Sequence, residues 1–275
     1  MVGSYRPRCE GKVALVTGAS RGIGKAIAER LASEGARVAL SARTLEPDER
    51  LEGSLRETAE VITALGGEAI AVQCDLSQPE DRRQMIDTTV DRLGPIDILV
   101  NNAAVTFFLP FDDFAEKRWR LMFEVQVRAP YELAQLVVPS MRERGAGWIL
   151  NISSRAGIHP QGPPFEPFHS SGVTVYGMVK AALDRFSTAL AAELYDDGVA
   201  VNSLSPWDNV STPGASHHDL VNDFTLEGPE WMAEAALLLC SSPPRQLTGL
   251  VAYSQPLLAA HNLRPAADGE DTSTE

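Results

Sequence analysis

Residues 13–35 read VALVTGASRGIGKAIAERLASEG, and they carry an apolar run, a glycine-rich turn and a helical pattern in direct succession. The pattern from about residue 22 to residue 34 has apolar residues at helical spacing, and Gly35 is the residue type typical of the position after a helix. Glycines permit a tight turn and let backbone N–H groups approach a pyrophosphate, to which the helix N-terminus adds partial positive charge. We therefore predict a dinucleotide-binding turn; glycines that serve only the conformation of the turn are the competing interpretation. The residues expected at the cofactor here are Gly18, Ser20, Arg21, Gly22, Ile23 and Gly24.

The rest of the chain alternates short apolar runs with longer amphipathic stretches, which is typical of an α/β domain. Most of the runs are apolar without alternation, as in parallel strands that helices cover on both faces. This pattern predicts one doubly wound parallel sheet of about seven strands, within a single domain over residues 1–263. Residues 264–275 are expected to be an acidic, solvated tail. The expected strands are residues 13–16, 38–40, 69–72, 96–100, 148–152, 199–204 and 250–253.

Two serines predict the starts of helices. Ser54 with Glu57, and Ser77 with Glu80, each fit the S-x-x-E capping box. In this motif the serine hydroxyl accepts a hydrogen bond from the backbone N–H three residues later. We therefore expect one helix to begin after Ser54 and another after Ser77.

The composition limits the classes of function. Of the 275 residues, 44% are hydrophobic and 22% are charged, as in soluble globular proteins. Asp and Glu number 37 against 24 Lys and Arg, and the formal charge of −13 is opposite to that of a protein that binds nucleic acid. No apolar run approaches the ~18 residues of a membrane span, and residues 1–12 are too polar for a signal peptide. We expect a cytoplasmic protein with neither nucleic acid nor membrane as a partner.

Cysteines and histidines indicate no metal site. Cys9, Cys74 and Cys240 are scattered and lack CxxC spacing, so neither a disulfide framework nor a zinc site is predicted, and buried thiols are expected. His159 and His169 lie ten positions apart without a third ligand, which favours loop polarity over metal binding.

The end of the second predicted strand bears on the choice of cofactor. An acidic residue there would bind the ribose hydroxyls of NAD(H) and repel a 2′-phosphate. This chain has Ala42 at that position and Arg43 directly after it. A guanidinium can pair with a phosphate through two hydrogen bonds, and Arg21 in the turn can approach from the other side. The two arginines favour NADP(H) over NAD(H); two solvated surface charges are the competing interpretation.

Tyr176 and Lys180 open a predicted helix, and their spacing of four puts both side chains on one helix face. A free tyrosine has a pKa near ~10 and is a poor acid–base group at neutral pH, but an adjacent ammonium favours the phenolate. Lys180 can therefore tune Tyr176. Taken alone, this spacing is usual on a helix surface, so its meaning depends on its place in the chain.

Six landmarks occur in order along the chain, and together they resemble the short-chain dehydrogenase/reductase family over nearly the whole length. The resemblance implies a Rossmann-type fold and hydride transfer between a nicotinamide and an alcohol or carbonyl carbon. The landmarks are residues 17–24, Asp75-Leu76, Asn101-Asn102-Ala103-Ala104, Asn151-Ile152-Ser153-Ser154, Tyr176 with Lys180, and Val201-Asn202 running to Pro206.

The resemblance implies a role for each matched residue. Tyr176 would be the general acid in carbonyl reduction and the base in alcohol oxidation. Lys180 would lower the pKa of Tyr176 and hold the nicotinamide ribose, and Ser154 would orient the substrate oxygen. A plain turn at Asn101-Asn102 and a polar strand end at Ser153-Ser154 are the alternatives. The cofactor contacts implied elsewhere are Asp75, Leu76, Asn102, Ala103, Ala104, Tyr176, Lys180, Pro206, Val210 and Thr212.

Two departures from the family pattern concern the catalytic residues. Gln126 stands where the family usually has the asparagine of a proton relay, and its extra methylene either rebuilds the relay or breaks it, or Gln126 only packs between helices. Ser154 and Tyr176 are 22 positions apart, where the family usually has about a dozen. The proline content of residues 155–175 predicts a stiff loop rather than a helix. We expect this loop to form part of the substrate wall.

Two further departures concern the C-terminal third. Trp207 follows Pro206 where the family usually has glycine, so Thr212 lies one position later than the pattern, and residues 253–258 replace a glycine-rich end. In this family residues 213–227 would form a mobile substrate lid. A set of aromatic residues predicts a bulky, apolar substrate, although core packing explains each one singly. These residues are Phe107, Phe108, Phe111, Trp207 and Phe224.

We expect an NADP(H)-dependent oxidoreductase that interconverts an alcohol and a ketone or aldehyde. Two other functions fit the same residues. One is a non-catalytic NADP(H)-binding sensor or scaffold, which Gln126 leaves open; the other is an epimerase or dehydratase at the same site. The resemblance also implies a homotetramer or dimer, assembled through the helices expected over residues 118–142 and 176–196.

Overall fold

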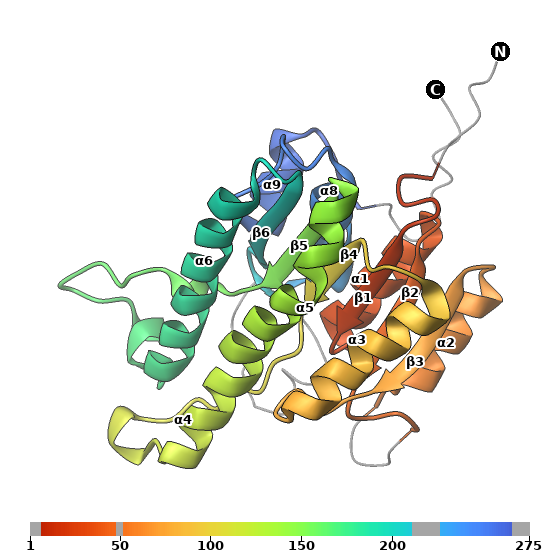
Figure 1. Cartoon of the computed structure of the whole chain (residues 1–275). Helices are drawn as coiled ribbons and strands as arrows, with labels where there is room; N and C mark the ends of the chain where they lie inside the picture. The colour runs from red at the N-terminus through yellow and green to blue at the C-terminus, as the bar shows by residue number, and fades with distance from the viewer. Residues whose placement is uncertain (1–6, 48–51, 211–225, 266–275) are drawn as a thin grey trace.

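A computed structural model describes residues 7–47, 52–210 and 226–265, and a seven-stranded parallel sheet runs through its middle (Figure 1). The strand order is β3-β2-β1-β4-β5-β6-β9, and every neighbouring pair is parallel. All seven predicted strands are confirmed, with small differences at their ends. The strands are β1 (Val13–Thr17), β2 (Arg37–Ala42), β3 (Glu68–Gln73), β4 (Ile98–Asn101), β5 (Gly147–Ile152), β6 (Val199–Ser205) and β9 (Val251–Tyr253).

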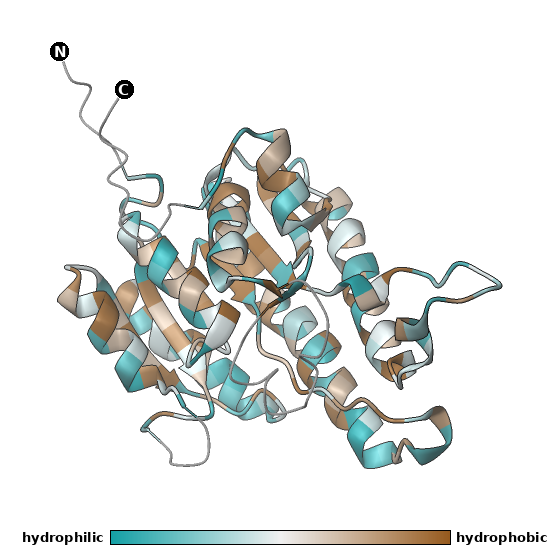
Figure 2. Ribbon diagram, turned by 180° about the vertical axis from the view of Figure 1, so that it is seen from behind, coloured by the Kyte–Doolittle hydropathy of each residue, from teal (hydrophilic) through white to brown (hydrophobic). Residues whose placement is uncertain are grey.

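Helices cover both faces of the sheet, and Figure 2 shows the brown, hydrophobic strands between them. In β1 all five residues are buried; Ala14 and Val16 belong to the core on one face, Val13 and Leu15 to the core on the other. Burial on both faces explains why the strands do not alternate between apolar and polar residues. The predicted doubly wound α/β fold is confirmed. One face carries α1 (Gly22–Ser33), α2 (Leu55–Ala64) and α8 (Pro229–Ser241), and the other carries α3 (Pro79–Leu93), α5 (Ala129–Arg144) and α6 (Thr174–Leu194).

The strand order reverses at β1, which lies between β2 and β4. The chain proceeds from β1 outward through β2 and β3, and then returns to the other side of β1 as β4. Connections that diverge in this way leave a crevice outside the carboxyl ends of the central strands. The predicted cofactor turn after β1 lies at this crevice.

Of the two predicted capping boxes, only the first caps its helix. Ser54 Oγ accepts a hydrogen bond from the backbone N–H of Glu57 at 3.1 Å, and α2 begins directly after Ser54. The prediction at Ser77 is wrong, because α3 begins two residues later, at Pro79. Proline lacks an N–H group and its fixed φ suits the first helical position, so Pro79 sets the start. Gly35 follows α1 with a φ of 87°, as predicted.

The stretch expected as one helix over residues 118–142 consists of α4 (Glu116–Phe123), a π-helix η2 (Glu124–Arg128) and α5. Arg82 of α3 is fully buried and pairs with Glu124, the first residue of this π-helix, and with Glu132 in the first turn of α5. The π-helix holds Gln126 inside the protein, where its side chain is 1% exposed. π-Helical turns inside α-helices are frequent at functional sites.

Residues 155–173 form the predicted loop, apart from two short 3₁₀ turns, η3 (Arg155–Gly157) and η4 (Pro167–Ser170). The tip of the loop projects away from the sheet, and residues 158–168 are exposed (Figure 1). Its far end is tied to the body by Leu109, whose N–H donates to Gly172 O at 3.2 Å. Only the two ends of the loop lie against the body in this structure, and a place for the loop in the substrate wall stays a prediction.

Three short elements near the C-terminus were not predicted. They are β7 (Asn209–Val210), β8 (Leu226–Glu227), which pairs with β7, and α9 (Ser254–Ala260), which follows β9 directly. Thr212, Phe224, most of the expected lid and residues 266–275 lie outside the described residues. In the part of the chain that the structure describes, no helix is long and apolar enough to cross a bilayer. All three cysteines are buried and unpaired, as predicted.

Candidate active site

The turn after β1 is held by Asn102, which follows β4 on the other side of the crevice. Asn102 Nδ2 donates to Thr17 O at 2.9 Å and to Gly18 O at 3.2 Å, and its backbone N–H donates to Thr17 Oγ1 at 3.0 Å. A Cβ atom would lie 2.8 Å from Asn102 Nδ2 at Gly18 and 2.3 Å from it at Gly24. Gly18 also has a φ of 68°, which side chains disfavour. Both positions therefore require glycine, and Asn102 shapes the turn as well as lining the groove.

The N-terminus of α1 carries no side-chain cap. Its N-cap residue is Arg21, whose Nη2 donates instead to Gly53 O at 2.6 Å. N–H groups left uncapped at a helix start attract anions, and the helix dipole adds to this effect. The bare helix start and the glycine turn fit the pyrophosphate of a dinucleotide. Of the other residues expected at the cofactor, Ser20 and Leu76 are buried, Gly22, Ile23, Ala103 and Pro206 are half-buried and Ala104 is exposed.

A polar hollow of about 470 Å³ lies beside the end of β2. Arg43 stands exposed at its rim, and Arg43 O accepts a hydrogen bond from Gln73 Nε2 at 2.8 Å. Asp75 Oδ1 accepts from Ser77 N at 2.9 Å, and Asp81 Oδ2 accepts from Asp75 N at 2.9 Å, so both acids are engaged with the backbone. The structure thus brings Arg43 and Asp75, both predicted cofactor residues, to one hollow. Its lining is Arg43, Ala71, Val72, Gln73, Asp75, Asp81, Gln84 and Thr88.

Ser154, Tyr176 and Lys180 come together at the carboxyl end of β5. Lys180 is 3% exposed, and its Nζ donates to Ile152 O at 2.9 Å. The same Nζ lies 5.6 Å from the centroid of the Tyr176 ring. Ser154 Oγ accepts a hydrogen bond from Ala156 N at 3.2 Å, and the Ser154 side chain hydrogen-bonds Tyr176. The three residues therefore form one hydrogen-bonded and electrostatic group.

Burial dominates the electrostatics of this group. It raises the pKa of the Tyr176 hydroxyl, and the hydrogen bond with Ser154 lowers it. Burial lowers the pKa of Lys180 to about 8, against the neighbouring carboxylate of Asp184, which raises it. Because an ammonium nearby favours a phenolate, a charged Lys180 acts with Ser154 against the burial of Tyr176. The arrangement can hold a proton at Tyr176 Oη and release it.

Gln126 is buried on η2, but it makes no hydrogen bond to Lys180. Its Nε2 donates to Val105 O at 2.7 Å, so the amide fixes the segment after β4. The hydrogen bond that the structure gives Lys180 goes to Ile152 O. No hydrogen bond in the described structure therefore joins Gln126 to Ser154, Tyr176 or Lys180.

The two departures in the C-terminal third meet in space. The backbone N–H of Trp207 donates to Ser254 Oγ at 3.0 Å, and Ser254 Oγ donates to Glu227 Oε1 at 2.8 Å. Gln255 Nε2 donates to Glu227 Oε2 at 2.9 Å, and the rings of Trp207 and Tyr253 pack edge to face at 5.9 Å. Burial raises the pKa of Glu227, against hydrogen bonds from Ser254 and Gln255. The two segments that depart from the family pattern, the one after Pro206 and residues 253–258, thus belong to one hydrogen-bonded network.

The other side of Trp207 is held by the residue after Ser154. The guanidinium of Arg155 lies 5.1 Å from the centroid of the Trp207 ring, and Arg155 Nη1 donates to Trp207 O at 3.2 Å. Trp207 is 39% exposed, so an open part of its ring is fixed near the end of β5. Val210 is buried in β7 and is the last described residue before Thr212.

Two of the five aromatic residues expected at the substrate are placed near the catalytic group. The Phe108 ring meets the Tyr176 ring edge to face at 5.4 Å, and Trp207 stands beside Arg155. Phe107 packs in a small core with Met122, and Phe111 is 73% exposed. Core packing therefore explains Phe107.

The sequence reasoning missed three charged residues. Asp184 lies four positions after Lys180, a spacing that was available as a signal. Arg82 and Glu227 are buried, and no local pattern in the sequence marks either of them. Within residues 7–47, 52–210 and 226–265 no group of three His, Cys, Asp or Glu side chains could hold a metal ion.

Known proteins resemble this chain in sequence and in fold. A family model for short chain dehydrogenases matches residues 12–217. The chain is 38% identical over 258 residues to dehydrogenase/reductase SDR family member 4 of Bos taurus, covering 87% of this chain and 84% of that protein. It is 31% identical over 264 residues to 7alpha-hydroxysteroid dehydrogenase of Escherichia coli strain K12, covering 91% and 95%. A solved metagenomic short-chain oxidoreductase in complex with NADP matches with a TM-score of 0.73 at 32% identity, covering 89% of this chain and 97% of that one.

Proposed function

This chain belongs to the short chain dehydrogenase family, and on that premise we propose that it is an NADP(H)-dependent oxidoreductase that interconverts an alcohol and a ketone or aldehyde. The observation that carries the proposal is the grouping of Ser154, Tyr176 and the buried Lys180 at the carboxyl end of β5. This group lies at the same edge of the sheet as the glycine turn after β1. Bound NADPH would supply the hydride in reduction, and bound NADP⁺ would accept it in oxidation.

The residues of the site handle the proton and the position of the substrate. Ser154 holds the substrate oxygen through a hydrogen bond. Tyr176 Oη gives a proton to that oxygen in reduction and takes it back in oxidation. The ammonium of Lys180, 5.6 Å from the Tyr176 ring, lowers the proton affinity of the phenol.

NADP(H) is the proposed cofactor because of the charges at the end of β2. Ala42 leaves no carboxylate at the position that would repel a 2′-phosphate, and Arg43 stands at the rim of the adjoining hollow. Arg21 is held nearby through Gly53, which lies in the connection after β2. The metagenomic relative, which was solved with NADP, supports the same choice.

The proposed substrate is a bulky, apolar carbonyl compound or the corresponding alcohol. Phe108, edge to face with Tyr176, and the fixed ring of Trp207 support this class, since apolar walls bind apolar ligands. A relative that is 31% identical carries the name 7alpha-hydroxysteroid dehydrogenase, which indicates a substrate of that kind for that relative.

The test is the loss of NADPH absorbance against a panel of ketones, aldehydes and quinones, with NADH run in parallel. We expect NADPH consumption with the wild type and at least a hundredfold less with Tyr176→Phe, because a general acid contributes about 10²–10⁴ in rate. Tight NADPH binding without turnover across the panel would favour a sensor or scaffold. Conversion of a substrate without net NADPH consumption would favour an epimerase or dehydratase.

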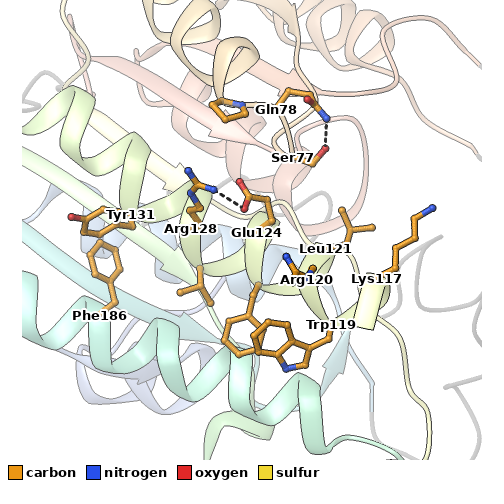
Figure 3. A pocket seen from close by; sticks show the side chains of 13 residues that line it. Ser77, Gln78, Lys117, Trp119, Arg120, Leu121, Glu124, Arg128, Tyr131 and Phe186 are labelled. Carbon is orange, nitrogen blue, oxygen red and sulfur yellow. Dashed lines mark hydrogen bonds and ion pairs between the residues drawn. The ribbon is translucent and has the colours of Figure 1, made fainter. Parts of the chain in front are cut away.

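We also propose that the chain works as a homotetramer or dimer. Its support is a hollow of about 710 Å³ on α4, η2, α5 and α6, shown in Figure 3. Tyr131 and Phe186 meet there edge to face at 5.8 Å, and Trp119 stacks on Phe123 at 4.4 Å. Tyr131 is 48% exposed and Trp119 39%, and exposed aromatic side chains are enriched at interfaces. Light scattering tests this proposal, and a monomer at micromolar concentration would refute it.

A further inference from the structure

We propose that Asp184 keeps Lys180 in its charged form and thereby sets the pH at which Tyr176 can take a proton from the substrate. Asp184 acts through Lys180, so it is a positioning residue and not a catalytic one. The first half of the proposal, the link between Asp184 and Lys180, is a property of the folded chain. The second half, the effect on the pH at which Tyr176 takes a proton, rests on the proposed function.

Helix geometry places the three side chains in line. Tyr176, Lys180 and Asp184 recur every four residues on α6, so they lie on one face of the helix, one turn apart. Lys180 Nζ donates to Ile152 O at 2.9 Å on β5, and Asp184 Oδ1 accepts a hydrogen bond from Ser203 Oγ on β6.

The register of the sheet shows that Ile152, which binds Lys180, and Ser203, which binds Asp184, are near each other. Ser203 pairs with Asn151, the residue before Ile152, and paired strands lie about 4.8 Å apart. The carboxylate and the ammonium are therefore bound at neighbouring positions on adjacent strands. No ion pair within 4 Å joins them in the described structure, so their attraction acts across a short gap.

The backbone of η3 closes over the carboxylate. A Cβ atom at Gly157 would lie 2.8 Å from Asp184 Oδ2 and 3.1 Å from the backbone N of Ala181, which shows how closely this turn packs on α6. Burial raises the pKa of Asp184, against the hydrogen bond from Ser203 and the charge of Lys180. In the partly dry space around Asp184, a charge acts more strongly than in water.

The charged and titratable groups that face this cluster come from three elements in the described residues. They are Tyr176 and Lys180 from α6, Arg155 from η3, and Tyr253 from β9. Burial and the charge of Asp184 raise the pKa of Tyr253, while the charge of Arg155 acts to lower it. The pKa is raised overall, so Tyr253 stays neutral near pH 7. Asp184 is the acid that raises the pKa of Lys180 against burial.

This link matters because Gln126 is engaged elsewhere. Its amide is bound to Val105 O and makes no hydrogen bond to Lys180. Without the carboxylate of Asp184, burial would leave a larger share of Lys180 neutral near pH 7. A neutral Lys180 no longer favours the Tyr176 phenolate, so Tyr176 would lose its proton only at higher pH.

The chain offers a direct test, because it contains four lysines, Lys12, Lys25, Lys117 and Lys180. Protein labelled with ¹³C at the lysine ε-carbon gives one NMR signal for each, and Lys180→Arg assigns the signal of interest. We expect the Lys180 midpoint to fall by about one pH unit or more in Asp184→Asn, as for loss of an opposite charge nearby, and to stay near the wild-type value in Asp184→Glu. Glu193→Gln is the control, since it removes an exposed charge from the same helix. Asp184→Ser replaces Asp184→Asn if the latter does not fold.

The second readout is the pH profile of kcat/KM for alcohol oxidation. We expect its rising limb to move to higher pH by a similar amount in Asp184→Asn, with the Kd for NADPH within about twofold of wild type. A Lys180 midpoint that is unchanged within about 0.3 pH unit in a folded Asp184→Asn or Asp184→Ser protein would overturn the link. A lower midpoint with an unmoved limb would overturn the second half. Absence of turnover in every protein, wild type included, would refute the proposed function, while the midpoints still decide the link.

Discussion

Replacing Arg82 by methionine should destabilise the fold by breaking buried ion pairs. Arg82 is fully buried; its Nη1 lies 2.9 Å from Glu124 Oε1 and its Nη2 lies 2.6 Å from Glu132 Oε2. It also donates to Leu76 O in the connection between β3 and α3. One guanidinium thus joins that connection to the first residue of the π-helix that carries Gln126 and to the first turn of α5.

The magnitude follows from the exposure of the partners. Breaking a buried ion pair costs about 3–5 kcal/mol, because it leaves a charge uncompensated. The carboxylates of Glu124 and Glu132 are 24% and 25% exposed, and each keeps Arg128 as a partner, at 3.4 and 2.8 Å. We therefore expect a smaller loss of unfolding free energy, about 2–4 kcal/mol. At about 2–4 °C per kcal/mol for a chain of this size, Tm should fall by about 5–15 °C.

Thermal unfolding followed by circular dichroism at pH 7 measures this loss. Arg120→Met is the matched control, because Arg120 pairs with Glu116 at 2.6 Å while both side chains are 73% exposed. An exposed pair of this kind contributes about 0–1 kcal/mol. A drop in Tm for Arg82→Met no larger than that for Arg120→Met would refute the reasoning.

Four other changes test separate parts of the structure. Arg43→Asp should raise the KM for NADPH about 10- to 100-fold, the value of a lost hydrogen bond to a charged group, without raising that for NADH; a variant that still strongly prefers NADPH would contradict the assignment. Gly24→Ala adds a Cβ 2.3 Å from Asn102 Nδ2 and from Gly18 O, so calorimetry should show NADPH binding at least about tenfold weaker. Gly66→Ala places its Cβ in open space but at a φ of 86°, so this control should lower stability and leave NADPH binding unchanged. Trp207→Ala should raise the KM for bulky apolar carbonyl substrates about tenfold and the KM for small ones less than about twofold. Equal effects on both KM values would contradict a contact between Trp207 and the substrate. Burial raises the pKa of Glu132, but hydrogen bonds from Arg128 and Arg82 outweigh this effect, so the pKa is lowered in the folded protein. The stability that this acid contributes is therefore present above its unfolded pKa of ~4.3 and is lost as the pH falls through the folded pKa. When Tm is measured against pH, the fall in Tm on acidification should be smaller in Arg82→Met than in the wild type.

The sheet and the cofactor turn could be predicted because their signals are local. β1 is apolar at all five positions and is followed at once by glycines, and each of the other strands is a short apolar run. Parallel strands buried on both faces leave this pattern without any knowledge of the partner strand. The spacing of Tyr176 and Lys180 is equally local, since one helix positions both residues.

The rest of the site depends on contacts between distant parts of the chain. The network of Trp207, Ser254 and Glu227 joins residues up to 47 positions apart, so the sequence showed two unrelated departures where the structure has one network. The π-helix at Gln126 is supported by Arg82, 44 positions earlier, and the expectation of a helix over residues 118–142 contained no sign of it. Ser77 was expected to cap α3, but the backbone preference of Pro79 decided the start.

The most direct test of the proposed chemistry uses NADPH that carries deuterium at both positions of C4 of the nicotinamide, with the carbonyl compound that the panel shows to react fastest. Mass spectrometry of the product measures whether the deuterium reaches the carbinol carbon. We expect one deuterium per product molecule with the wild type, and a rate at least about a hundredfold lower with Tyr176→Phe. A product without deuterium, or a Tyr176→Phe variant that turns over as fast as the wild type, would contradict it.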